Sequence, residues 1–425
     1  MTAKDSLVTD NMSKLELKAG EPHHHSFEPS AAAASVVELG FAEELDPADL
    51  YRVRYHHYFF QGKIGGLPAW LSFRDLPSPS ELACGVCHQP TSLLLQIYAP
   101  VAGREDCFHR SLFVFLCKNP ACCLANKADN FRVFRCQLPR KNDFYDEENP
   151  LDPDLHLPDS WPPGLKTVQD YTNLCAVCGC QAPKRCSQCL QETYCSKAHQ
   201  AVHWKHGHKE ACKKNTEDKS VVKPSASLEP MQGTVLFPEF ELWTEPEEPI
   251  PEVREGERSE KDRFASFKKY LESSKEAVSN GKSDCKTIDP YVLEDMVRKP
   301  DRAFKLFRRT LDQNPEQVIR YQLGGRPLWA TSVDSSSSAT PTDGLSASLN
   351  ASSPPPCESC GAARQFECQL MPHLLSLLDV DQVGKSIDWA TVAIFSCSKQ
   401  CGKEGDYQLE WLRKQDFACE EDFDA

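Results

Sequence analysis

Short apolar runs with the length of β-strands recur along this chain, and they form two groups. The first group contains SLLLQIY, SLFVFLC and FRVFRCQ, between residues 92 and 137. The second contains RQFECQLM, ATVAIFSC and YQLEWL, between residues 364 and 412. Runs of four to eight residues rich in Leu, Ile, Val and Phe favour buried strands, because helices in globular proteins are usually longer. The pattern therefore predicts two β-rich segments that lie far apart in the sequence.

Apolar residues at helical spacing occur mainly between these two groups. They predict helices over residues 262–278 and 293–321, the second of them interrupted by Pro300 and Pro315. The run HLLSLL after Met371 and Pro372 predicts a short buried helix that covers the second sheet. The helices are thus few, and the fold is expected to be α+β and β-rich.

The two groups are parts of an internal duplication. GGLPAWL at 65–71 precedes the first and GGRPLWA at 324–330 precedes the second. A CxxC pair, a strand ending in cysteine, a further cysteine, another strand and an RKxDF segment then follow in both. Five features in one order indicate two equivalent halves. Each Gly-Gly-x-Pro-x-Trp segment is expected to turn the chain and insert Trp70 or Trp329 into a core.

The two halves are expected to form one body. A small sheet with one open apolar face is marginally stable alone, and pairing two such sheets would bury both faces. The remaining segments are then a tail, linkers and insertions. The expected organisation is a disordered tail (1–35), an N-terminal half (36–144), an acidic linker (145–170), a cysteine-rich module (171–214), a second acidic linker (215–260), a helical segment (261–320) and a C-terminal half (321–420) with a Ser-rich loop (332–356).

Cysteine usage points to metal binding. The chain of 425 residues has 21 cysteines and no run of about 18 apolar residues that could span a bilayer. Its first residues lack the charged-then-apolar pattern of a secretion signal, so a cytoplasmic and nuclear location is expected. Thiols stay reduced in these compartments, which favours metal ligands over disulfides.

Residues 171–214 contain eight candidate ligands in four closely spaced pairs. Two residues between paired cysteines allow a tight turn that directs both sulfurs to one ion, and three suit a single helical turn. So short a segment cannot make its own core, and structural zinc supplies about 10–16 kcal/mol to such modules. Two zinc ions are predicted; His203 and His206 flank the ligand histidine and compete with it in the assignment, and Cys180 is expected to be a spectator. The ligands are Cys175, Cys178, Cys186, Cys189, Cys195, His199, His208 and Cys212.

Each half offers a further site of four cysteines, in the manner of a zinc ribbon, and one zinc ion is predicted in each. Cys123 competes with Cys122 for the fourth position of the first site, and simple reduced thiols at strand ends are the alternative to metal binding. The candidate ligands are Cys84, Cys87, Cys117 and Cys122 in the first half, and Cys357, Cys360, Cys397 and Cys401 in the second.

Charge and motifs favour a protein-binding role. A net charge of −14 argues against a general nucleic-acid binder and suits a basic client protein. The chain has neither a Gly-x-Ser-x-Gly elbow nor a Walker loop, and four protein ligands leave no open position on a zinc ion. We therefore expect no enzyme, no catalytic residue, no organic cofactor and no membrane partner. A basic patch on the cysteine-rich module keeps RNA as a lesser alternative.

The ligand order in residues 175–212 resembles the MYND zinc finger. Tyr194, Gln200 and Trp204 stand at positions typical of that family, whereas His199 stands where many of its members have cysteine. The resemblance implies interleaved ligation. One ion would be bound by Cys175, Cys178, Cys195 and His199, and the other by Cys186, Cys189, His208 and Cys212.

The whole arrangement resembles the programmed cell death protein 2 family. VELGF at 37–41, GKIGGLPAWL, LQIYAP at 95–100, FPEFE at 237–241 and KSIDWATVAIFSC carry this resemblance. It implies a dedicated chaperone or adaptor for a small-subunit ribosomal protein of the universal S5 family, supporting 40S ribosome biogenesis. In the alternative interpretation, the finger recruits proline-containing peptides to nuclear transcription or apoptosis complexes. The expected fold is a pair of zinc-pinned β halves forming one body, with the finger tethered by linkers and sharing no core with it.

Overall fold

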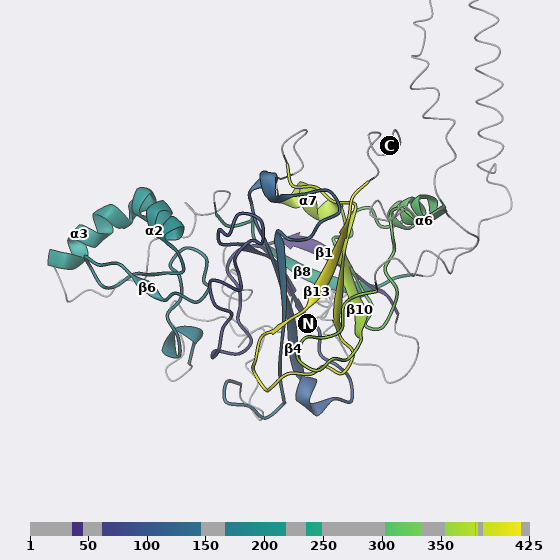
Figure 1. Ribbon diagram of the computed structural model, residues 1–425, viewed down its shortest axis with the longest axis horizontal. Coiled ribbons are helices and arrows are strands. Elements are labelled where there is room, and N and C mark those ends of the chain that lie inside the picture. Colours follow the sequence, from purple (N-terminus) through teal and green to yellow (C-terminus); the bar gives the residue numbers. More distant parts are fainter. Residues whose placement is uncertain are drawn as a thin grey trace, which may run out of the picture.

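A single antiparallel sheet of eleven strands dominates the fold of this chain (Figure 1). The computed structural model describes residues 36–45, 62–145, 166–217, 235–248, 302–332, 353–378, 380 and 386–417. The strands are β1 (Glu38–Glu44), β2 (Gly62–Ile64), β3 (Ser92–Tyr98), β4 (His109–Leu116), β5 (Phe131–Leu138), β8 (Phe240–Pro246), β9 (Ile319–Tyr321), β10 (Arg364–Leu370), β11 (Thr391–Cys397), β12 (Gln408–Leu409) and β13 (Trp411–Gln415).

The strand order displays the duplication directly. It runs β12-β5-β4-β3-β2-β8-β1-β9-β10-β11-β13, which is symmetric about the β8–β1 pair apart from β12. Strands β2, β3, β4 and β5 of the first half thus correspond to β9, β10, β11 and β13 of the second. This arrangement confirms that two similar β halves form one body.

The two central strands of the sheet, β1 and β8, each pair with strands that lie far away in the sequence. β1 comes first along the chain, yet it pairs with β9 of the second half, with Leu39 opposite Arg320. β8 follows the finger and pairs with β2 of the first half, with Lys63 opposite Glu241. β8 lies in residues expected to be an acidic linker, and β9 lies in residues expected to be helical. Both expectations were wrong there, because pairing with distant strands overrides the local pattern.

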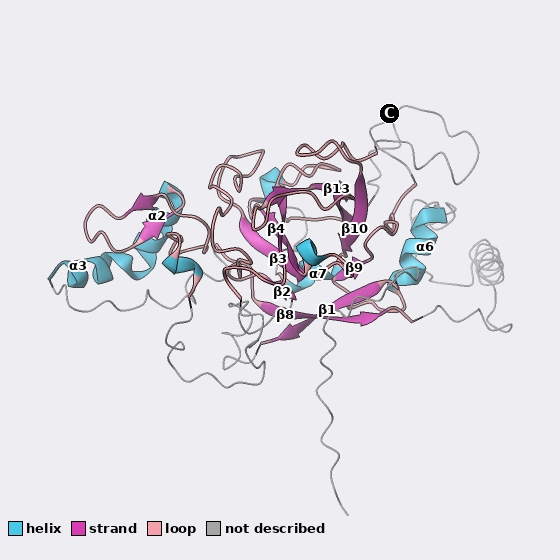
Figure 2. Cartoon of the chain, turned by 90° about the horizontal axis from the view of Figure 1, so that it is seen from below, coloured by secondary structure: helices cyan, strands magenta, loops and turns pink. Residues whose placement is uncertain are grey.

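One stretch of chain joins the two edges of the sheet. β12 pairs with β5, and β13, which follows after a single residue, pairs with β11. That single residue, Glu410, donates its backbone N–H to the carbonyl oxygen of Val133 at 2.9 Å. The sheet therefore curls into a near-closed barrel, as the views in Figures 1 and 2 show. Closure leaves few free strand edges for association with other chains.

The interior of the barrel has an apolar part and a charged part. Leu112, Val114 and Ile394 belong to the apolar part, together with Leu374 and Leu375 of helix α7 (His373–Leu377). This helix was expected to cover the second sheet; it forms, and its leucines pack into the shared interior. The charged part contains Arg110 with Glu367, and Arg135 and Arg364 with Glu410.

The zinc finger packs against the outer face of the first half. Trp70 is only 2% exposed and donates its indole N–H to the carbonyl oxygen of Gly179 at 2.8 Å. Gly179 has φ +67, and a Cβ placed there would lie 3.3 Å from Pro68, so glycine permits this close approach. The finger and strands β3 to β5 share one apolar cluster. The expectation that the finger shares no core with the body was wrong, because Trp70 bridges the two.

The remaining regular elements are short. Among the described residues no helix has the length and apolarity needed to cross a membrane. The predicted helix over 262–278, the tail 1–35 and most of the Ser-rich loop lie outside the described residues. The other helical elements are η1 (Glu105–Cys107), η2 (Pro120–Cys122), η3 (Val168–Asp170), α2 (Lys197–His203), η4 (Trp204–His208), α3 (Lys209–Glu217) and α6 (Arg302–Leu311), and a two-stranded ribbon of β6 (Lys184–Arg185) and β7 (Thr193–Tyr194) completes the finger.

Candidate metal centres

The first candidate centre of the finger joins a CxxC turn to the start of helix α2. Cys175 and Cys178 face Cys195 and His199, and the four ligand atoms all lie within 4.8 Å of one another. Ser196 caps the helix, since its side chain accepts a hydrogen bond from the His199 backbone N–H at 3.1 Å. This cap begins the helix between the two ligands, so that one helical turn brings His199 beside Cys195.

The second centre of the finger is built in the same way from the other pairs. Cys189 Sγ lies 3.7 Å from His208 Nε2, and Cys186 Sγ lies 3.9 Å from Cys212 Sγ. The helix that carries His208 and Cys212 is interrupted at Gly207, which has φ +129. The structure thus brings together the interleaved sets that the resemblance to MYND fingers implies.

Both finger centres fit zinc by distance and by chemistry. Tetrahedral Zn–S bonds of about 2.3 Å place ligand sulfurs about 3.8 Å apart. Cys178 Sγ and Cys195 Sγ are 3.7 Å apart, which agrees. Hydrogen bonds from the thiols of Cys178 and Cys195 hold the pKa of Cys175 far below its ordinary value. The same hydrogen bonds raise the pKa of Cys178 and Cys195, so the cluster favours one thiolate, at Cys175, and thiolate is the form that zinc binds.

The neighbouring cysteine and histidines of the finger lie outside both centres. His203 is buried, and its Nδ1 lies 3.0 Å from the Tyr194 hydroxyl; burial lowers the pKa of His203 to about 4, so the ring is neutral near pH 7. His206 is exposed. Cys180 directs its thiol to the carbonyl oxygen of Cys178 at 3.6 Å.

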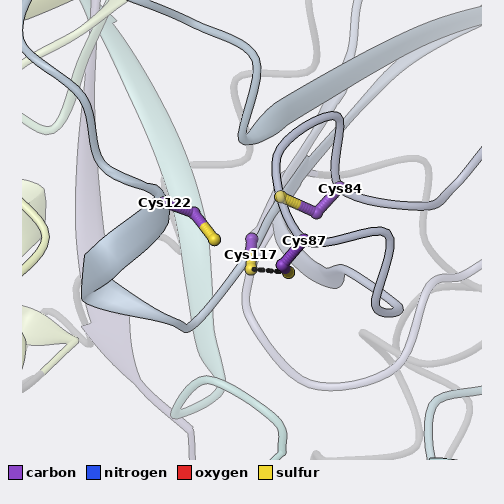
Figure 3. Close-up of side chains that lie close together, drawn as sticks. All are labelled: Cys84, Cys87, Cys117 and Cys122. Atoms are coloured by element: carbon purple, nitrogen blue, oxygen red, sulfur yellow. Dashed lines mark hydrogen bonds between the residues drawn. The ribbon is translucent and has the colours of Figure 1, made fainter.

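The third candidate centre lies at the end of β4 in the first half (Figure 3). Cys117 follows β4 directly, and its sulfur lies 3.7 Å from that of Cys87. Cys122 reaches the cluster from η2, a turn capped by the Asn119 side chain. Cys123 points elsewhere, with its sulfur 3.3 Å from the carbonyl oxygen of Asp388. The structure therefore favours Cys122 over Cys123 as the fourth ligand.

The fourth candidate centre occupies the corresponding place in the second half. Cys357 Sγ lies 3.4 Å from Cys401 Sγ, and Cys360 Sγ lies 3.5 Å from Cys397 Sγ. Glu410 supports this centre, because its carboxylate accepts a hydrogen bond from the Cys397 backbone N–H at 3.1 Å. Sequence reasoning missed Glu410, since no spacing rule connects it with the cysteines.

A duplicated β body, an inserted finger and four Cys or Cys/His clusters that could each hold a metal ion define the class: a zinc-finger protein. Family descriptions match the same three parts of the chain. They are "Programmed cell death protein 2, N-terminal domain" at residues 36–152, "MYND finger" at 175–212 and "Programmed cell death protein 2, C-terminal putative domain" at 301–420. The chain belongs to the programmed cell death protein 2 family.

Curated relatives agree over most of the chain. Programmed cell death protein 2 of Bos taurus is 40% identical over 390 residues, which cover 91% of this chain and 98% of that protein. Programmed cell death protein 2-like of Mus musculus is 26% identical and covers 80% and 85%. "Probable 20S rRNA accumulation protein 4" of Schizosaccharomyces pombe is 26% identical and covers 82% and 91%. No solved structure matches.

Purified full-length chain is expected to contain four zinc ions. Each of the four clusters supplies four ligand atoms that lie within 4.8 Å of one another, the number that a tetrahedral zinc ion takes. Elemental analysis by inductively coupled plasma mass spectrometry, after dialysis against metal-free buffer, measures the ratio of zinc to protein chains. A value near two would mean that only the finger binds metal and that both half-sites are reduced thiol clusters.

Proposed function

We propose that this chain is a dedicated chaperone or adaptor for a basic ribosomal protein of the small subunit, of the universal S5 family. The observation that carries the proposal is the match along 91% of a fission yeast protein whose name refers to 20S rRNA accumulation. In this role the chain supports 40S ribosome biogenesis and acts in both cytoplasm and nucleus.

The charge and the chemistry of the fold support a binding role. The net charge is −14, and Glu43, Glu44, Glu245 and Glu248 are exposed on and just beyond strands β1 and β8. An acidic surface speeds the encounter with a basic client and shields the client's charge. Each metal cluster offers four protein ligands, which suits a structural ion and leaves no open coordination position for chemistry. We therefore propose no enzymatic activity and a protein partner in preference to nucleic acid.

The finger supports a second candidate function, as a regulatory scaffold that recruits proline-containing peptides. Its Leu190 is 60% exposed, which leaves an apolar contact on the finger surface. Leu190 also has φ +57, a conformation that asparagine adopts more readily than leucine. The substitution Leu190→Asn therefore removes the apolar contact without straining the backbone.

Affinity purification of the tagged full-length chain from cells, followed by quantitative mass spectrometry, separates the two functions. The chaperone function predicts one basic ribosomal protein in near-equal molar amount, from both the wild type and Leu190→Asn. The scaffold function predicts regulatory proteins from the wild type and their loss in Leu190→Asn. Recovery of such proteins with no enriched ribosomal protein would overturn the chaperone proposal.

A further inference from the structure

The metal-site loop of the second half, residues 397–410, leaves its own half and packs against the first. Its backbone and the Gln400 side chain form hydrogen bonds with residues of β4, of β5 and of the loop before β4. The Cys401 carbonyl oxygen accepts a hydrogen bond from Arg135 at 2.6 Å. The other contacts join the Lys399 carbonyl oxygen to Arg104 at 3.4 Å, the Gln400 carbonyl oxygen to Gln137 at 3.0 Å, the Gln400 side chain to Arg110 at 2.9 Å and the Gly405 N–H to the Gln137 carbonyl oxygen at 2.9 Å.

Tyr407 fixes the middle of this loop on the first half. Its hydroxyl donates to the Ser72 carbonyl oxygen at 2.8 Å and accepts from the Ser72 N–H at 3.1 Å. Its ring packs edge-on against Trp70 and Phe113. Tyr407 therefore holds the loop on the first half by aromatic packing and by two hydrogen bonds to the Ser72 backbone.

The metal-site loop of the first half makes the reciprocal crossing. Directly after Cys122, the Leu124 carbonyl oxygen accepts a hydrogen bond from Lys414 at 3.1 Å. The Asn126 N–H donates to the Asp416 carboxylate at 2.7 Å, and the Asp416 N–H donates to the Asn126 side chain at 2.9 Å. Each half thus forms hydrogen bonds with the metal-site loop of the other half.

The ligand cysteines hold the base of each crossing loop. A metal ion at Cys357, Cys360, Cys397 and Cys401 would fix Cys401 to the CxxC turn of its own half, at the point where the loop departs. The fit of these residues to a tetrahedral ion rests on their sulfur separations of 3.4 and 3.5 Å. Without that bond, hydrogen bonds would still tie the loop to its own half, from the Ser398 N–H to the Ala363 carbonyl oxygen at 3.0 Å and from the Ser359 hydroxyl to the Gln408 side chain at 2.8 Å, but none of them fixes Cys401 to the CxxC turn.

We propose that the two four-cysteine sites are clasps that keep the barrel closed, so that metal occupancy decides whether β12 stays paired with β5. The β5–β12 pair, called the seam here, has two paired positions, as β2 and β3 do, whereas β1 and β8 at the opposite side of the barrel share seven. The seam differs from the β2–β3 pair because its two strands come from different halves. Loss of metal releases β12 from β5, while the two halves stay joined through β2, β8, β1 and β9 and through the Arg110–Glu367 ion pair.

The second clasp is the more accessible of the two. Cys360 is exposed and Cys401 is half-buried, whereas in the first site only Cys87 is half-buried and the other three ligands are buried. All eight finger ligands are buried as well. The site of the second half therefore exchanges its metal first, and this inference about closure holds whether or not the client is a ribosomal protein.

Hydrogen–deuterium exchange of full-length protein carrying Cys360→Ser tests the clasp. Because Cys360 is exposed, serine removes a ligand without emptying a packed site. The backbone amides of Gly405 and Glu410, which donate to carbonyl oxygens of β5, should exchange about tenfold faster or more, and those of β1 and β8 less than about twofold faster. Zinc content should fall by one ion per chain. The matched control Cys189→Ser, which removes one ligand from the finger, should lose zinc but keep the seam protected.

A second variant keeps all the metal ligands. Tyr407→Phe removes the two hydrogen bonds to Ser72 while it retains the ring, so zinc content should be unchanged and the same seam amides should exchange about three- to tenfold faster. Unchanged seam exchange in Cys360→Ser overturns the proposal. Equal acceleration across all strands in that variant overturns it too, because the site would then support the whole fold and not the seam.

Discussion

Glu367→Gln is expected to lower the free energy of unfolding by about 3–5 kcal/mol, because it leaves the charge of Arg110 buried without a counter-charge. Both side chains are fully buried, and Arg110 Nη2 donates to Glu367 Oε2 at 2.8 Å. The pair joins β4 of the first half to β10 of the second. Urea unfolding of the zinc-loaded protein, monitored by tryptophan fluorescence, measures the loss.

The double variant Arg110→Met, Glu367→Leu is the matched control. It removes both charges and should recover part of the lost stability; recovery should be incomplete, because Arg110 also donates to the Gln400 side chain and the Ala99 carbonyl oxygen. A double variant as unstable as Glu367→Gln would show that the site needs the ion pair itself.

Acidification offers an independent test of the same ion pair. Burial alone would raise the pKa of Glu367, but the neighbouring Arg110 charge outweighs this effect and lowers it. A glutamate whose folded pKa is lowered stabilises the protein above its unfolded pKa, and that contribution is lost as the pH falls through the folded value. Wild type should therefore lose stability on acidification more steeply than Glu367→Gln. Parallel pH profiles would contradict this account.

Trp70→Ala is expected to lower the free energy of unfolding by about 3–5 kcal/mol and to release the finger from the body. Trp70 stacks on Phe113 with ring centroids 5.3 Å apart, and its indole N–H provides the hydrogen bond to Gly179. Unfolding measurements give the energy, and limited proteolysis around residues 171–214 reports the release. Trp70→Phe keeps an aromatic ring in the same place. It should lower the free energy of unfolding by only about 1–3 kcal/mol, because the Gly179 carbonyl oxygen loses its hydrogen-bond donor.

The duplicated tryptophan supplies the control. Trp329 stands at the same point of the repeat but remains partly exposed, packed beside Phe395 and under the Arg413 guanidinium. Trp329→Ala should cost less than about 2 kcal/mol, since less apolar area is buried there. Equal costs at Trp70 and Trp329 would show that finger docking adds nothing.

The sequence carried enough information for the local chemistry and too little for the connections between distant parts. CxxC turns and strand-end cysteines are local patterns, so the sixteen candidate ligands could be named, and the structure groups them in fours. β8 and β9 could not be found in this way. β9 has three residues, and both strands are defined by partners far along the chain, Lys63 of β2 for β8 and Leu39 of β1 for β9.

The docking of the finger was missed for a similar reason. Acidic, proline-rich flanking segments suggested an isolated module, and nothing near Gly179 in the sequence points to Trp70. The hydrogen bond between them spans 109 residues. Gly179 carried the available signal: a glycine directly after a CxxC pair is consistent with a close approach by another part of the chain.

The way in which β12 closes the sheet determines when this chain can finish folding. β5 ends at Leu138 and its partner begins at Gln408, so about 270 residues must follow β5 from the ribosome before that edge is covered. At about 5–20 residues per second, strand β5 waits roughly 15–55 s with the backbone groups of its outer edge unpaired, while its other edge pairs with β4. β1 waits similarly for β8 and β9. During this interval the nascent chain exposes unpaired strand edges that can associate with other chains, so we expect its folding to depend on general chaperones. We also expect folding to be slow, because the strands that pair are far apart in the sequence.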